Sequence, residues 1–146
     1  MVMPILDTRP IHAFLRERGA ERLPHPGGTL HAHLTRVAAL LAEWGADEEL
    51  QAAGLCHAAY GTDGYAPALL GVDERPVLRD LIGVRAESLV YLYASCRRSA
   101  VYPGLGRERP VPFLNRFTGA TRTPPEREIR AFAELTAANE LDVVRR

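Results

Sequence analysis

Two histidines, His33 and His57, lie where their imidazoles could exchange protons with a substrate near neutral pH. Residues 29–45 and 47–61 predict two consecutive helices, because each run starts with a Thr or Asp N-cap and ends at a glycine. The spacing of apolar residues at three and four places each imidazole on the inward face of its helix. Two inward histidines in adjacent helices predict a shared site. Core histidines that only make hydrogen bonds are the structural alternative.

Three polar residues follow His57 at the predicted end of the second helix. Tyr60 lies one turn beyond His57 on the same face, so we expect its phenol to hydrogen-bond a substrate or the imidazole. Thr62 and Asp63 lie in the next turn, from which both can reach a bound ligand. Capping of the helix end is the alternative role for each of these two residues, and the sequence leaves both roles open.

Residues 33–38, HLTRVA, and residues 52–57, AAGLCH, resemble the core of the HD-domain superfamily. That superfamily comprises helical, metal-dependent phosphohydrolases and some di-iron oxygenases, and the hydrolase domain of ppGpp-degrading enzymes is similar in spacing. The resemblance is tight over these two helices and loose over the remainder. It implies an all-α fold, with residues 1–146 forming a single HD-like helical bundle of five to seven helices.

The metal site of that superfamily uses one His, a His-Asp pair and a distant Asp, and this chain keeps only part of the set. His33 and His57 match the two histidines, whereas Ala58 replaces the paired Asp and Asn139 replaces the distant one. Two imidazoles and an amide leave the charge of a divalent ion unbalanced in a partly dry interior. We therefore expect no tightly bound metal pair and no other cofactor.

A single divalent ion is the alternative for this site. Zinc or iron binds imidazole well, and Asp63 or Glu87 would then have to supply the missing carboxylate. Glu87 also has a simpler interpretation as an exposed or edge carboxylate, because it projects away from Leu89 on the apolar stripe of its predicted helix.

Asn139 lies on the apolar side of the last predicted helix, which begins at Thr123 with two prolines in its first turn. A buried amide must be hydrogen-bonded. In an HD-like arrangement His33 or His57 would be its partner, and Asn139 would orient an imidazole or contact the substrate. A backbone group near the helix end is the alternative partner.

Residues 99–123 are rich in Pro, Gly and Arg and show no helical periodicity. They predict a long loop within the domain, which would serve as a lid or a partner-binding arm. Within it Arg116 is a candidate ligand for a substrate phosphate or carboxylate, since Phe113, Leu114 and Phe117 can dock this segment on the core. A solvated loop is the alternative.

The composition bounds the remaining possibilities. With 146 residues, 47% hydrophobic and 25% charged, the chain suits one globular domain with a sizeable core. The formal net charge is +0, which favours neither nucleic acid nor a membrane surface as a partner. No run approaches transmembrane length, and the two cysteines predict buried thiols in the cytoplasm. Tyr91, Tyr93 and Tyr102 are candidates for a homodimer face.

These features favour a small-molecule enzyme on an HD-like fold. In this interpretation paired histidines perform acid/base chemistry on a polar metabolite, as in a lyase, isomerase, cyclase or hydrolase. The alternatives are a residual metal-dependent phosphohydrolase, a non-catalytic protein that binds a small ligand or a partner, and a structural module whose histidines only stabilise the core.

Metal analysis of the purified chain separates the first two possibilities. We expect no stoichiometric zinc, iron or manganese, because the site lacks both family carboxylates. A stoichiometric ion that disappears in His33→Ala and in His57→Ala would favour the phosphohydrolase instead.

Overall fold

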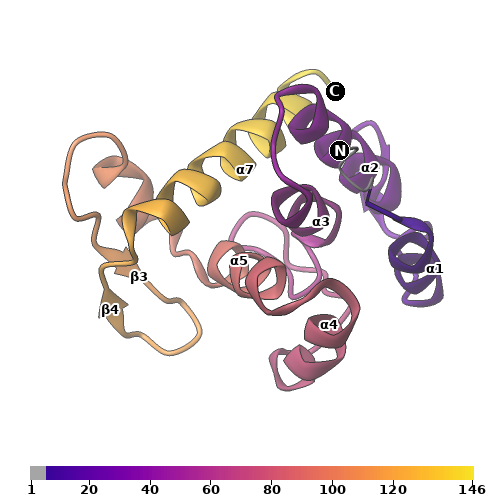
Figure 1. The fold of residues 1–146 in the computed structure, drawn as a ribbon, viewed down its shortest axis with the longest axis horizontal. Coiled ribbons are helices and arrows are strands. Elements are labelled where there is room, and N and C mark those ends of the chain that lie inside the picture. Colours follow the sequence, from indigo (N-terminus) through magenta and orange to yellow (C-terminus); the bar gives the residue numbers. More distant parts are fainter. Residues whose placement is uncertain (1–5) are drawn as a thin grey trace, which may run out of the picture.

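Helices dominate the computed structural model, which describes residues 6–146 (Figure 1). Residues 1–5, which the predicted domain included, lie outside the described residues. The seven α-helices are α1 (Arg9–Glu17), α2 (Leu30–Glu43), α3 (Glu48–Cys56), α4 (Arg75–Ile82), α5 (Val84–Ser95), α6 (Arg98–Val101) and α7 (Glu126–Val144). Two short 3-10 turns, η1 (Val72–Glu74) and η2 (Tyr102–Gly104), complete the helical part.

Two small antiparallel sheets correct the expectation of a purely α-helical chain. In the first, β1 (Pro24–His25) pairs with β2 (Gly28–Thr29), so that His25 lies opposite Gly28. In the second, β3 (Phe113–Leu114) pairs with β4 (Thr121–Arg122). Backbone pairing requires no helical periodicity, and pairs this short leave little sequence pattern to detect. The fold is therefore mostly helical with two hairpins.

The segment 99–123 is more ordered than the predicted loop. It contains the end of α6, the turn η2 and the β3–β4 hairpin, which lies beside the start of α7 in Figure 1. Phe113 is buried at 1% exposure, and Arg97 donates its backbone N–H to the carbonyl of Leu114 at 3.1 Å. The expected docking of this segment on the core is confirmed for Phe113, whereas Phe117 is 37% exposed.

The capping residues predicted at the starts of the two histidine helices are confirmed. The Thr29 side chain accepts a hydrogen bond from the backbone N–H of Ala32 at 3.2 Å, and Asp47 accepts one from Leu50 at 2.8 Å. The predicted end of the second helix is wrong, since α3 stops at Cys56 and His57 is its C-cap. The chain turns at this point rather than continuing to Gly61, because residues 57–60 leave the helical hydrogen-bond ladder.

Helices α2, α3, α5 and α7 surround the buried interior. α7 runs from the β3–β4 hairpin to the beginning of α2, so the last turns of the chain lie beside α2 (Figure 1). α3 packs tightly on α2 at Gly54, where a Cβ atom would stand 2.5 Å from Cδ1 of the fully buried Leu41. This close approach offsets the poor helix propensity of glycine. No described helix is both long and apolar enough to span a bilayer.

We expect Gly54→Ala to lower the free energy of unfolding by about 1–2 kcal/mol, because overpacking against Leu41 outweighs the gain in helix propensity. Urea denaturation measures the change. In a Leu41→Ala background the clash is absent, and the same substitution should be neutral or stabilising by up to about 1 kcal/mol. Equal changes in the free energy of unfolding in both backgrounds would show that the contact with Leu41 is not the reason for glycine at position 54.

Candidate functional site

Four separate segments place polar side chains around one buried point. His33 comes from α2, His57 from the C-cap of α3, and both Asn139 and Asp142 from the last turns of α7. These four side chains are at most 7% exposed. The β1–β2 hairpin adds His25. A cluster of this polarity in the interior requires that each group find a hydrogen-bond partner.

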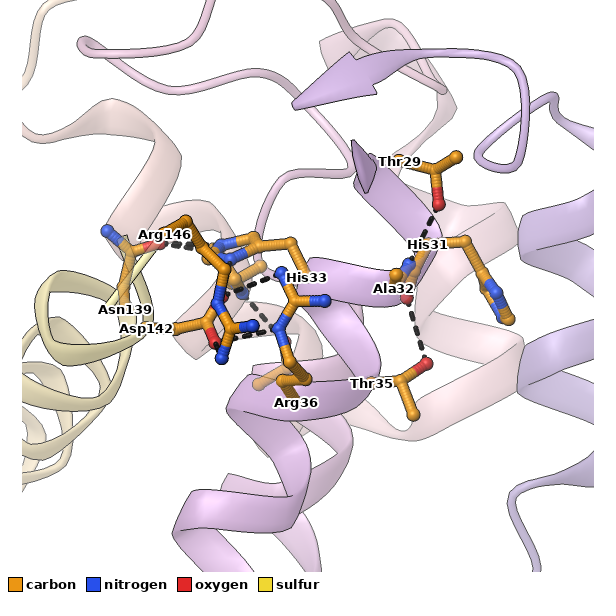
Figure 2. A network of polar contacts seen from close by, with 11 residues as sticks. Thr29, His31, Ala32, His33, Thr35, Arg36, Asn139, Asp142 and Arg146 are labelled. Atoms are coloured by element: carbon orange, nitrogen blue, oxygen red, sulfur yellow. Dashed lines mark hydrogen bonds and ion pairs between the residues drawn. The ribbon is translucent and has the colours of Figure 1, made fainter. Parts of the chain in front are cut away.

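His33 and Asp142 form a closely paired dyad. Nδ1 of His33 lies 2.7 Å from Oδ2 of Asp142, so the ring N–H donates to the carboxylate. Arg36 donates to both oxygens of the same carboxylate, at 2.8 and 3.2 Å (Figure 2). Arg146 lies 3.5 Å from Oδ1. Burial opposes ionisation of Asp142, but the hydrogen bonds from Arg36 and His33 outweigh it and lower the pKa of the carboxyl.

Helical spacing explains how two helices build this dyad. His33 and Arg36 are three residues apart on α2, and Asn139 and Asp142 are three apart on α7. Residues at this spacing share one helix face. When α7 lies along α2, each pair therefore meets the other pair, as the dashed contacts in Figure 2 show.

His57 is held in one tautomer by the backbone. Its Nδ1 lies 2.7 Å from the carbonyl oxygen of Gly54, so Nδ1–H donates and Nε2 keeps a free electron pair. Burial is the main cause that lowers the pKa of His57 to about 3, and the nearby His33 lowers it further. The ring is therefore neutral at neutral pH.

The Asn139 amide bridges the two imidazoles. Oδ1 lies 2.9 Å from Nε2 of His33 and 3.1 Å from Nε2 of His57. With the amide oxygen inward, both Nε2 atoms would need protons, and the neutral His57 ring has none to give. A half-turn of the amide exchanges oxygen for NH2 at the same place. Each ring, whose Nδ1–H is already donated to Asp142 or to Gly54, then accepts one N–H from Asn139 at Nε2.

His25 covers the dyad from the β1–β2 hairpin. Its ring stacks on His33 with 3.9 Å between ring centroids and an interplanar angle of 18°. Its buried Nδ1 has no hydrogen-bond partner among the described residues. Burial and the neighbouring His33 lower the pKa of His25 to about 4. Tyr65 helps to hold this hairpin, since its hydroxyl donates to the carbonyl oxygen of Pro24 at 2.7 Å.

A cavity of about 140 Å³ opens beside the three imidazoles. Its other polar lining comes from Thr62, Arg98, Asn139 and Glu140, and its lining residues also include Pro26, Ala58, Gly64, Tyr65 and Val143. Sites for drug-sized ligands usually measure ~300–1,000 Å³. The cavity therefore fits a small metabolite or one end of a larger one. Two larger hollows, of about 760 and 560 Å³, contain none of the histidines.

The structure places Tyr60 and Glu87 away from this cavity. The Tyr60 hydroxyl donates to Oε2 of Glu87 at 2.8 Å, so it bonds neither imidazole, contrary to one predicted role. Glu87 is fully buried, which corrects the exposed alternative, and Arg75 donates to both of its oxygens at 2.8 and 2.9 Å. A carboxylate already neutralised by Arg75 and bonded by Tyr60 is in no position to complete a metal site at His33.

The remaining predicted residues separate into two groups. Thr62 lines the cavity, as do His33, His57 and Asn139. Asp63 instead accepts the backbone N–H of Arg98 at 2.8 Å and pairs with Arg97 at 3.7 Å. Arg116 donates to the carbonyl oxygen of Ala94 at 2.7 Å, which fastens the β3–β4 hairpin to α5. Asp63 and Arg116 therefore position the backbone around the site.

Four residues of the site had not been selected from the sequence as functional. Asp142 and its partner Arg36 repeat the three-residue spacing of Asn139 and His33, and this shared helical face was the available signal. His25 lies between two prolines in a segment that gives no periodic signal. Arg98 reaches the cavity only through a tertiary contact. Within residues 6–146, no three His, Cys, Asp or Glu side chains form a metal-binding group.

Comparison with known proteins adds one finding. A family model described as "Domain of unknown function (DUF6817)" matches residues 14–98, which is more than half of the chain and includes His25, His33, His57 and Arg98. The match ends before α7, so Asn139 and Asp142 lie outside it. Searches of the curated proteins and of the solved structures found no significant match.

The buried neutral His57 predicts a pH-dependent stability. As the pH falls below about 6.5, the unfolded chain protonates this ring while the native ring stays neutral until about pH 3. Native stability should therefore fall by about 1.4 kcal/mol per pH unit through this residue. Urea denaturation from pH 7 to pH 4 measures the slope. His57→Gln should flatten it by nearly this amount, whereas an unchanged slope would show that the native ring already titrates.

Proposed function

Because the chain belongs to the family described as "Domain of unknown function (DUF6817)", which names no activity, we propose its function from the site: an enzyme that performs acid/base chemistry on a small polar metabolite. His33 accepts and returns the proton. The reaction class is that of a lyase, isomerase, cyclase or hydrolase, because all of these need a proton moved at a positioned atom.

The hydrogen bond between His33 and Asp142 is the observation that supports this proposal. A carboxylate 2.7 Å behind Nδ1 fixes the tautomer and leaves Nε2 as the basic atom. The same carboxylate stabilises the imidazolium that forms when Nε2 takes a proton. Arg36 keeps Asp142 ionised and in place, so the dyad needs little rearrangement during the reaction.

His57 and Asn139 supply the polar surroundings of the transferred proton. His57 stays neutral and offers the electron pair of Nε2, while the Asn139 amide stands between the two rings. A substrate X–H group that displaces the amide finds two imidazole electron pairs on rings whose centroids are 5.2 Å apart. The displaced Asn139 amide is then free to hydrogen-bond the same substrate.

An HD-like scaffold remains part of the proposal, and its metal pair does not fit the residues present. Only neutral donors, from His33, His57 and Asn139, converge at the point where a metal would bind. The carboxylate of Asp142 is engaged by His33 and Arg36 on the Nδ1 side of the imidazole. A divalent ion would lack the anionic ligands that usually balance its charge, so we derive no step through a metal.

A residual metal-dependent phosphohydrolase is the second candidate. One observation favours it: Nε2 of His33 and Nε2 of His57 lie 2.9 and 3.1 Å from the same atom of Asn139, so both imidazole nitrogens face one point at which a single ion could bind.

Turnover in the presence of a chelator tests the proposal. Pools of small polar metabolites are incubated with the full chain and EDTA, and conversion is followed by proton NMR. We expect a consumed metabolite, and a rate that falls about 10²–10⁴-fold in His33→Gln because the proton acceptor is lost. Asp142→Asn should also slow the reaction, since the amide no longer stabilises the imidazolium.

His12→Gln is the matched control. His12 is partly buried and contacts His31 at 2.9 Å, outside the cavity, so this variant should keep the wild-type rate. A metabolite that binds but is never consumed would remove catalysis from the proposal. Activity that EDTA abolishes and zinc or manganese restores would favour the second candidate.

A further inference from the structure

We propose that Arg98 is a carboxylate-binding residue, so that the substrate is a small carboxylic acid held by its carboxylate while His33 moves a proton. This inference rests on the function proposed above and names its substrate class. It starts from the fact that Arg98 lines the same cavity as His25, His33 and His57.

The guanidinium of Arg98 is largely buried without a close anion. Its side chain is 24% exposed, and Nη2 lies 3.2 Å from the Tyr93 hydroxyl and 3.5 Å from Oγ1 of Thr62. Both partners are neutral oxygens. Among the described residues its one ion pair is with Glu140, at 4.0 Å, and the Glu140 side chain is 48% exposed. Such a guanidinium retains N–H groups for an added anion.

Three other half-buried arginines are differently engaged. Arg36 donates to both oxygens of Asp142, and Arg75 does the same to Glu87, each with a shortest contact of 2.8 Å. Arg116 donates to a backbone carbonyl at 2.7 Å. The guanidiniums of Arg36, Arg75 and Arg116 are therefore already bonded to groups of the protein. Arg98 faces a cavity and lacks such a pair, which is the arrangement expected of a ligand-binding residue.

The turn beside α6 is built around this side chain. A Cβ atom at Gly64 would collide with Nη1 of Arg98, so glycine leaves the space that the guanidinium occupies. Asp63 accepts the backbone N–H of Arg98 at 2.8 Å and fixes the start of the side chain. Thr62, from the same turn, lines the cavity next to the guanidinium.

The charges around the cavity favour a monoanionic carboxylate over a dianionic phosphate. A planar carboxylate accepts two parallel N–H bonds from one guanidinium. The cavity measures about 140 Å³, and its histidines His25 and His57 are neutral, so Arg98 is its main positive charge. Glu140 lies on the same wall and would repel a dianion more strongly than a monoanion.

Titration of the full chain with acetate tests the assignment, with chloride keeping the ionic strength constant. Binding is read from the imidazole and Arg98 side-chain resonances by NMR. We expect saturable shifts of the His33 and His57 signals in the wild-type chain. Arg98→Gln should weaken acetate binding about tenfold or more, because a charge-assisted pair is lost. Arg98→Lys should weaken acetate binding by an intermediate factor, because lysine keeps the positive charge but cannot donate two parallel N–H bonds to the carboxylate.

Arg85→Gln is the control for charge. It removes one positive charge from an exposed residue that pairs with Glu49 outside this cavity, and acetate binding should change less than twofold. Thr62→Val provides a milder variant if Arg98→Gln unfolds, and it should weaken binding by a smaller factor. Equal weakening by Arg85→Gln, or tighter binding of inorganic phosphate than of acetate, would overturn the assignment.

The readout separates this inference from the proposed function. Acetate binding requires no turnover, so His33→Gln should slow catalysis about 10²–10⁴-fold and still bind acetate through Arg98. Turnover without acetate binding would leave the acid/base enzyme in place and remove the carboxylate subsite. Acetate binding without turnover of any metabolite would leave the subsite and remove the enzyme.

Discussion

The buried carboxylate of Asp142 joins the end of the chain to its first long helix. It accepts hydrogen bonds from His33 and from Arg36, both on α2, and it lies near Arg146, just beyond the end of α7. An isolated carboxylate would be too costly to bury, and these partners are what make its burial tolerable. The same contacts hold α7 against α2 and set the direction of the His33 ring. The packing of α7 on α2 and the proposed proton transfer at His33 therefore both depend on the carboxylate of Asp142.

A second buried carboxylate shows how differently the same chemistry can be used. Glu87 is also fully buried and also receives two hydrogen bonds from one arginine, Arg75. Its third partner is the hydroxyl of Tyr60, and its cluster does not border the histidine cavity. Glu87 thereby joins α5 to Arg75 at the start of α4 and to Tyr60 in the turn after α3. Asp142 differs because its third partner is an imidazole whose opposite nitrogen faces the site, so only Asp142 can transmit its charge to a reacting atom.

The cavity brings together neutral bases and one largely buried cation, Arg98. His25 and His57 have lowered pKa values because they are buried beside other imidazoles, and they surround the site without charging it. Arg98 gives the positive charge, and its guanidinium lies against Gly64 in the wall of the cavity. These surroundings suit the transfer of a proton between His33 and a small anionic molecule. When no such molecule is bound, the Asn139 amide hydrogen-bonds both imidazoles.

Local sequence determined the helical framework and the inward position of the two histidines. The caps Thr29 and Asp47, Gly45 just after the end of α2 and the three- and four-residue spacing are all local, and they are the signals a helix needs. The amide at Asn139 was also predictable as a buried group that must find a partner. Tertiary structure alone decided which groups meet. The pairing of His33 with Asp142 spans 109 residues, and His25 and Arg98 reach the cavity from a hairpin and from the start of the short helix α6, neither of which carries a periodic pattern. Such contacts depend on how α7 packs along α2, and packing between distant segments is not encoded in the spacing of neighbours.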